Sequence, residues 1–182
     1  VADISLYDHV KLTAAFASAI YAYLKKQNIT DYKTELYKNA SLFYDKKAFL
    51  LASLDISGIQ KFIYTITTKS ALKSLRSRSF YLEIMMEHII DTLLDKLHLS
   101  RANLIYSGGG HCYMILPNTK ETQTIFDEEI KNVNKWFLKH FQTALYIAGA
   151  YVSCSSKDLQ NEPNGSYSAL YRDLSTKLSL NK

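Results

Sequence analysis

The sequence predicts an α+β domain with a ferredoxin-like fold, in which helices cover one face of an antiparallel sheet. Three observations lead to this fold class. Short apolar runs alternate with longer amphipathic stretches, and Ser107-Gly108-Gly109-Gly110 joins two of the runs as a hairpin turn would. The order that results is strand, helix pair, strand, turn, strand, helix, strand, which is the split βαβ arrangement.

The first 47 residues form a helical appendage and linker in this interpretation. Apolar residues recur at helical spacing over 10–26, whereas 28–47 is polar with weak periodicity and is expected to be a linker or an irregular strand pair. We therefore divide the chain into this appendage, 1–47, and a main domain, 48–182.

The main domain begins with an apolar run at 48–56 that suits a buried central strand. Ser57-Gly58 follows and can cap a helix over 59–66. The remaining predicted elements are helix 71–97, strands 103–107 and 111–116, helix 120–141, strand 144–153 and helix 168–178.

The composition indicates a folded domain and argues against a membrane protein. With 182 residues, 47% of them hydrophobic and 21% charged, the chain is long enough for a folded core. It contains no apolar run of 18 residues, so we expect no membrane partner and a cytoplasmic location. The chain begins at Val1 with no charged-then-apolar leader, which indicates a piece of a longer polypeptide.

The cysteines and histidines do not suggest a metal site. Cys112 and Cys154 have no partner at ligand spacing and are expected to be small buried residues. The five histidines form no HxxxH or HExxH pattern, which argues against a self-contained zinc site.

A basic segment lies between Asp55 and Glu83. The net charge of +5 is mild, but this segment contains no acidic residue. Its cations would attract phosphate from a nucleotide or a nucleic acid, although a solvated basic face is an equal alternative. They are Lys61, Lys69, Lys73, Arg76 and Arg78.

Asp55 and the glycine turn are expected to lie side by side. Palm-type nucleotidyltransferases place a carboxylate at the end of the first strand and one or two more on this hairpin, where they hold two divalent cations. Asp55 suits the first ligand and is the only candidate metal ligand, because Gly110 and His111 stand where acids would be needed. One carboxylate does not hold two metals, so we assign no catalytic residue.

The same segments suit nucleotide binding. A glycine turn lets backbone N–H groups approach a phosphate or a base, and Ser57-Gly58 at a helix start adds an anion site. From the hairpin alone, a turn that merely needs positive φ is the simpler explanation. Together with Asp55 and the basic segment, the balance favours a nucleotide site.

Four ordered motifs resemble one family. Residues 54–63 (LDISGIQKFI), 75–82 (LRSRSFYL) and 107–110 (SGGG) resemble the first palm of the large subunit of type III CRISPR effector complexes, the Cas-ten family of Csm type. Residues 5–9 (SLYDH) are similar to the end of that family's HD nuclease domain. Asp8-His9 reverses the order of the HD pair, so we expect a structural or inter-domain role there.

This resemblance implies a function for the longer protein. In that family a second palm carries a Gly-Gly-Asp-Asp hairpin, and the two palms close around ATP to make cyclic oligoadenylate when target RNA is bound. The HD domain is a single-strand DNase. The resemblance therefore implies ATP as substrate, Mg or Mn in the full-length enzyme, and an isolated fragment that is inactive. The implied partners are the second palm of the same chain, sister subunits, guide RNA and target RNA, with a homodimer of the fragment as a further expectation.

Carried over by position, two segments would line the ATP pocket: Asp55, Ile56, Ser57 and Gly58, and Ser107, Gly108, Gly109 and Gly110. Lys61, Arg76 and Arg78 are candidates for phosphate or RNA contacts.

Two alternatives stay open. One is an RNA-binding module in which Tyr106, Tyr113 and Tyr146 stack on bases across an open sheet face. The other is a scaffold for sister subunits that binds no nucleotide.

Overall fold

The computed structural model describes residues 5–64 and 71–182. Its elements are α1 (Leu6–Lys26), the π-helical turn η1 (Thr34–Lys38), α2 (Ala40–Asp45), β1 (Phe49–Ser57), α3 (Ile59–Tyr64), α4 (Ala71–Lys96), the 3₁₀ turn η2 (Arg101–Asn103), β2 (Leu104–Gly108), β3 (His111–Pro117), α5 (Lys120–Phe141), β4 (Tyr146–Cys154), α6 (Ser156–Leu159) and α7 (Ser166–Leu180). The predicted end of the helix at 66, and Lys69, lie outside the described residues. Within those residues, no helix combines the length and the apolarity that a membrane crossing requires.

The four strands form one antiparallel sheet in the order β2-β3-β1-β4. This is the strand order of a ferredoxin-like fold, so the predicted fold class is confirmed. β1 lies in the middle, where Asp55 is opposite His111 on β3 and Ala148 on β4. The end of β1 is therefore held between the glycine hairpin and the last strand.

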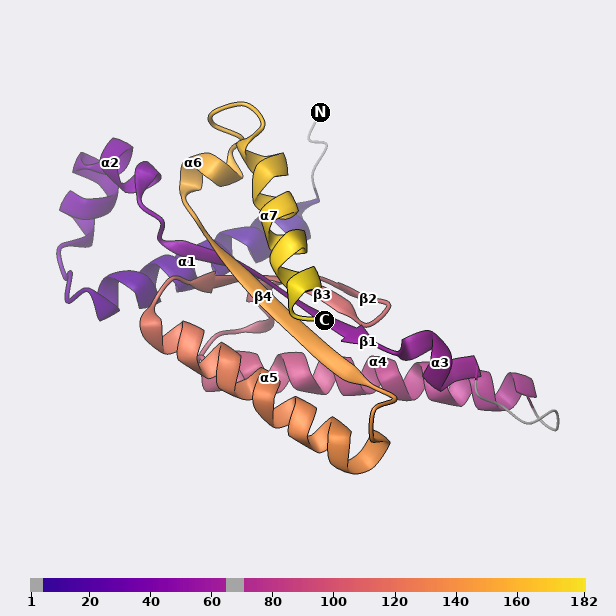
Figure 1. Cartoon of the computed structure of the whole chain (residues 1–182). Coiled ribbons are helices and arrows are strands. Elements are labelled where there is room, and N and C mark those ends of the chain that lie inside the picture. Colours follow the sequence, from indigo (N-terminus) through magenta and orange to yellow (C-terminus); the bar gives the residue numbers. More distant parts are fainter. Residues whose placement is uncertain (1–4, 65–70) are drawn as a thin grey trace.

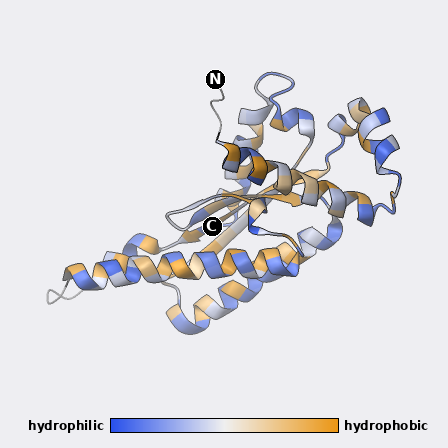
Figure 2. Cartoon of the chain, turned by 180° about the vertical axis from the view of Figure 1, so that it is seen from behind, coloured by the Kyte–Doolittle hydropathy of each residue, from blue (hydrophilic) through white to orange (hydrophobic). Residues whose placement is uncertain are grey.

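Helices cover both faces of the sheet, and the prediction of one covered face was wrong. Leu54 and Ile56 of β1 belong to a core with α4 and α5, whereas Phe49 and Leu51 belong to a second core with α1 and α7. Figure 1 shows the two helix pairs on opposite sides of the sheet. The alternation of hydrophobic and hydrophilic residues along α4 is visible in Figure 2. Burial on both faces explains why β1 begins with an unbroken apolar run, Phe49 to Ala52.

Residues 28–47 are largely helical, so the irregular strand pair given as one expectation for this segment was wrong. η1 and α2 are short, and only Phe43 is buried between them. Contacts with other segments stabilise them, since Phe43 joins the second core and Lys157 of α6 reaches Asp45. Such tertiary contacts leave little periodicity in the local sequence.

The first helix begins at Leu6, four residues before the predicted start. Ser5 is its N-cap, because its hydroxyl accepts a hydrogen bond from the backbone N–H of Asp8 and donates one to the Asp8 carboxylate at 2.6 Å. In this structure Asp8 therefore has a helix-capping role. The segment that resembles the end of an HD domain is thus also the start of α1.

A β-bulge interrupts the pairing of β2 with β3 between Leu104 and Tyr106. Leu104 packs in the core on the α4 side, while Tyr106 lies opposite Tyr113 on the α7 side. The extra residue shifts the side-chain alternation, so Ser107 lies opposite buried Cys112 on the α4 side. The bulge thus decides which face of the sheet the Ser107 hydroxyl occupies.

Candidate nucleotide site

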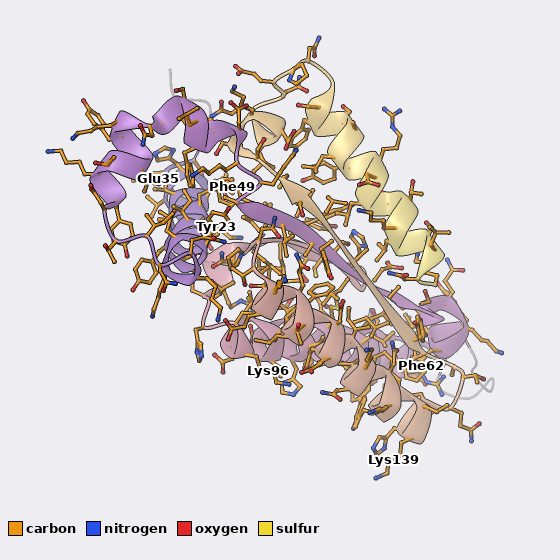
Figure 3. All side chains as sticks on the ribbon, turned by 60° about the vertical axis from the view of Figure 1, so that its left-hand side comes forward. Tyr23, Glu35, Phe49, Phe62, Lys96 and Lys139 are labelled. Atoms are coloured by element: carbon orange, nitrogen blue, oxygen red, sulfur yellow. The ribbon has the colours of Figure 1, made fainter. Side chains whose placement is uncertain are left out.

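The two predicted segments meet at one end of the sheet. The backbone N–H of Ile56 donates to the carbonyl of Gly110 at 2.8 Å, which joins the end of β1 to the hairpin turn. Figure 3 labels Phe49 at the start of β1 and Phe62 just past its other end, where this junction lies. The backbones of both segments are therefore neighbours, as the sequence predicts.

The turn itself consists of Gly109 and Gly110, whose φ angles are 62° and 80°. Two consecutive positive φ angles define the tight turn that matches the twist of a hairpin. A Cβ on Gly110 would lie 2.3 Å from Cδ1 of Ile59, whereas a Cβ on Gly109 would meet nothing within 4 Å. Gly109 is thus the exposed tip of the site, and Gly110 is its packed base.

Gly58 is constrained in the same way. Its φ is 88°, and an added Cβ would lie 2.0 Å from the carbonyl oxygen of Ala144. Its own carbonyl accepts a hydrogen bond from the N–H of Phe62 and so begins α3. Glycine here allows the β1–α3 loop to pack against the loop that precedes β4.

Asp55 is already bound by other side chains. Its Oδ2 lies 2.6 Å from Nζ of Lys182, and its Oδ1 lies 3.3 Å from Nδ1 of His111. His111 Nε2 in turn lies 3.4 Å from the Ser53 hydroxyl. About 19% of the Asp55 side chain is exposed, so little of the carboxylate remains accessible.

Asp55 and the side chains around it do not fit a two-metal centre. Magnesium prefers several oxygen ligands, but Asp55 has a lysine and a histidine beside it. Among residues 5–64 and 71–182, no group of three or more His, Cys, Asp or Glu is arranged to hold a metal ion.

Ser107 is engaged on the opposite face. Its hydroxyl donates to Oε1 of Glu87 on α4 at 2.9 Å. Glu87 also pairs with Arg101, which binds Asp91 at 2.6 Å. Burial raises the pKa of Glu87, but the hydrogen bonds from Arg101 and Ser107 and the charge of Arg101 outweigh it and lower the pKa.

The structure therefore brings the predicted site together only in part. The Asp55 side chain lies on the α7 face, and that of Ser107 lies on the α4 face. Ile56 is buried in the first core and offers no side chain to a ligand. What both segments present jointly is backbone at the end of the sheet, with Gly109 outermost.

The three basic candidates differ in how much of each side chain is exposed. Arg78 donates from Nη1 to the carbonyl of Phe62 at 2.6 Å, and its guanidinium lies 5.4 Å from the centre of the Phe62 ring. It therefore joins α4 to α3. Lys61 and Arg76 lie on the exposed surface.

The three tyrosines proposed as stacking platforms do not share an open face. Tyr106 is 54% exposed, and Tyr146 is exposed at the start of β4. Tyr113, by contrast, lies under α7, with its ring centre 5.3 Å from that of Tyr171. α7 thus covers the middle of the surface that the RNA-binding alternative requires.

Both cysteines are buried free thiols, and their burial confirms the expectation of small buried residues. Sequence reasoning missed Glu87, Arg101 and Lys182. Glu87 and Asp91 are four residues apart on a predicted helix, a spacing that places both carboxylates on one face. However, the sequence near Arg101 and Ser107 does not indicate that their side chains contact this face of the helix.

The chain is similar to one family of proteins. A family model described as Csm1 subunit domain B matches residues 48–182. Proteins named CRISPR system single-strand-specific deoxyribonuclease Cas10/Csm1 (subtype III-A) are similar along the chain. The protein of Enterococcus italicus is 52% identical over 98% of this chain, and that of Streptococcus thermophilus is 50% identical over 100%. The chain spans about a quarter of these relatives, 24% of each.

Solved structures give the same result. A crystal structure of a Csm1–Csm4 cassette in complex with pppApA superposes with a TM-score of 0.86 and 31% identity, over 98% of this chain and 24% of that one. A cassette in complex with one ATP gives a TM-score of 0.83 and 32% identity, over 98% of this chain and 23% of that one.

Proposed function

This chain belongs to the Cas10/Csm1 family of type III-A CRISPR proteins, and from that premise we propose that it is a first palm domain that binds ATP without supplying catalytic acids. The Csm1–Csm4 cassettes that it resembles were solved in complex with ATP, pppApA or cA4, which supports a nucleotide ligand. In the full-length subunit, a second palm with an acidic hairpin would complete a cyclic oligoadenylate synthase that is activated by target RNA in antiviral defence.

The exposed glycine turn beside the end of β1 carries this proposal. Gly109 projects no side chain, and a Cβ there would meet open space. Backbone N–H groups of such a turn can approach a phosphate or a base closely. Asp55, bound to Lys182 and His111, would shape this end of the sheet rather than perform chemistry.

The catalytic ions would belong to the other palm. In the full-length enzyme Mg²⁺ or Mn²⁺ would offset the charge of the triphosphate there. The residues of this chain would bind and orient the nucleotide. An isolated fragment would then make no oligoadenylate from ATP.

The proposed partners follow from the same assignment. They are the second palm of the same polypeptide, a Csm4-type subunit such as those in the similar cassettes, and guide and target RNA within a cytoplasmic complex. A HD domain preceding this chain would supply single-strand DNase activity. The isolated chain is proposed to form a homodimer in place of the missing palm.

The test compares Gly109→Ala with Gly165→Ala in a full-length subunit that carries this chain. Both glycines have positive φ, and a Cβ at either one would meet nothing within 4 Å. Both substitutions therefore cost about 1–2 kcal/mol of folding free energy for the same backbone reason. Gly165 lies at the start of α7, outside the proposed site.

Calorimetric titration should show ATP binding at least about tenfold weaker for Gly109→Ala and unchanged for Gly165→Ala, a difference of about 1.4 kcal/mol. Equal affinities for the two variants and the wild type would place ATP elsewhere. Oligoadenylate synthesis by the isolated chain would contradict the assignment as a non-catalytic palm.

A further inference from the structure

The hydroxyl of Ser107 has a single proton, and the structure shows where that proton points. A serine hydroxyl donates one hydrogen bond and accepts others, whereas an ionised carboxylate only accepts. In the contact of 2.9 Å between Ser107 and Glu87, Ser107 is therefore the donor. Any further partner of the Ser107 oxygen must donate to it.

Glu87 is held in its ionised form. Arg101 contacts Glu87 through one guanidinium nitrogen and Asp91 through the other. These contacts and the bond from Ser107 lower the pKa of Glu87 although burial raises it. The carboxylate thus keeps the Ser107 proton directed toward α4 at neutral pH.

This polarity excludes a phosphate at Ser107. The oxygens of a nucleotide triphosphate are anionic acceptors, and at this position they would meet a lone pair with a carboxylate behind it. Sugar hydroxyls and exocyclic amino groups, in contrast, can donate. Ser107 is half-buried and lies two residues before exposed Gly109, the first residue of the turn, so it borders the proposed site.

We propose that Ser107 accepts a hydrogen bond from a donor group of the bound nucleoside, a ribose hydroxyl or the adenine amino group, and that Glu87 is the positioning residue that fixes this polarity. The inference rests on the proposed ATP site and adds which part of ATP lies at Ser107. The phosphates then lie on the turn backbone, away from Glu87.

The first test uses Glu87→Gln with Asp91→Asn as its matched control, in a full-length subunit. Both substitutions neutralise a carboxylate held by Arg101, but only Glu87 contacts Ser107. Glutamine can donate to Ser107 and so turn the serine proton toward the ligand. We expect Glu87→Gln to weaken ATP binding about tenfold and Asp91→Asn to leave it within about twofold.

Charge alone predicts the opposite change in ATP affinity for Glu87→Gln, because removing a negative charge should strengthen the binding of anionic ATP. Tighter or unchanged binding by Glu87→Gln therefore overturns the proposal.

The second test identifies the donor group. Inosine triphosphate lacks the amino group, and the 2′-deoxy and 3′-deoxy analogues of ATP each lack one hydroxyl. One of the three should bind the wild type about tenfold more weakly than ATP, and Ser107→Ala should abolish that difference. If Ser107→Ala leaves every such difference intact, the assignment is wrong.

A third measurement is independent of ATP. Carboxyl NMR titration of the chain should show a higher pKa for Glu87 in Ser107→Ala than in the wild type, since a stabilising donor is lost. An unchanged pKa refutes the hydrogen-bond polarity itself. The expected pKa change with no ATP binding by the wild type would instead refute the proposed function, and the nucleoside assignment with it.

Discussion

Gly109 and Gly110 are adjacent but meet different constraints. Both need positive φ, yet only Gly110 is also packed, against Ile59 at the start of α3. Alanine at Gly109 thus measures backbone strain alone, whereas alanine at Gly110 adds a steric clash. Comparing the two alanine variants therefore distinguishes the cost of the turn conformation from the cost of disturbing the contact between the hairpin and α3.

We predict that Gly110→Ala lowers the free energy of unfolding by about 2–4 kcal/mol, compared with about 1–2 kcal/mol for Gly109→Ala. Ile59→Val removes the atom that the new Cβ would meet, Cδ1 of Ile59. It should therefore recover part of the loss in Gly110→Ala while destabilising the wild type. Urea unfolding of the four proteins measures this coupling, and strictly additive effects would contradict the contact.

The segments of the site were predictable, but their side-chain directions were not. Asp55 follows an apolar run and Ser107 precedes three glycines, and these patterns place both at one end of the sheet. The bulge between Leu104 and Tyr106 then moves Ser107 to the other face. Nothing in the sequence of β2 specifies a bulge, because it depends on how both strands pack.

At the scale of elements, the short helix α6 depends on its cap. The Asp158 carboxylate accepts from the backbone N–H of Ser155 at 2.6 Å and pairs with Lys47 at 2.5 Å. It thus ties α6 to the residues just before β1. Burial raises the pKa of Asp158, but these hydrogen bonds outweigh it and lower the pKa.

Asp158→Asn should therefore lower Tm by a few degrees at pH 7. Because the pKa of Asp158 is lower in the folded state than in the unfolded state, the stabilisation is present above about pH 4 and lost as the pH falls through the folded value. The difference in Tm between variant and wild type should shrink from pH 5 toward pH 2 in thermal scans. Asp173→Asn, which removes an exposed helical ion pair with Lys177, is the control and should change Tm little at any pH.

Long elements were predicted better than short ones. The helix at 120–141 was predicted with its observed limits, because its repeated apolar positions and its Thr119 cap are local signals. The helices between 34 and 45, and α6, were missed. Each is about one or two turns long and owes its stability to distant partners such as Lys47 or Lys157.

At the scale of the whole molecule, α1 is joined to the sheet through Asn103. The buried Asn103 amide donates to the carbonyls of Ala15 and Ile115, and its oxygen accepts from the Ser18 hydroxyl. The division at 47/48 remains a proposal, and the family match begins at residue 48. The packing, in contrast, predicts that α1 unfolds together with the sheet.

Native-state hydrogen exchange tests this prediction. Amides of α1 should exchange with the same free energy as those of β1, and those of η1 and α2 should exchange sooner because only Phe43 is buried there. Asn103→Ala should cost about 1–3 kcal/mol and make α1 exchange before β1. Asn134→Ala removes two hydrogen bonds to Ile147 on the edge strand β4. In this variant the amides of α1 and β1 should still exchange with the same free energy. Early exchange of α1 in the wild type would contradict the prediction.

The central position of β1 has a consequence for synthesis on the ribosome. β1 pairs with β3 and with β4, and Phe49 finds its partner on β4 only at Cys154. The most apolar strand of the sheet therefore leaves the exit tunnel long before its last neighbour has been translated. Until then one edge of a hydrophobic strand is exposed to other chains, so nascent chains stalled before β4 should be clients of molecular chaperones.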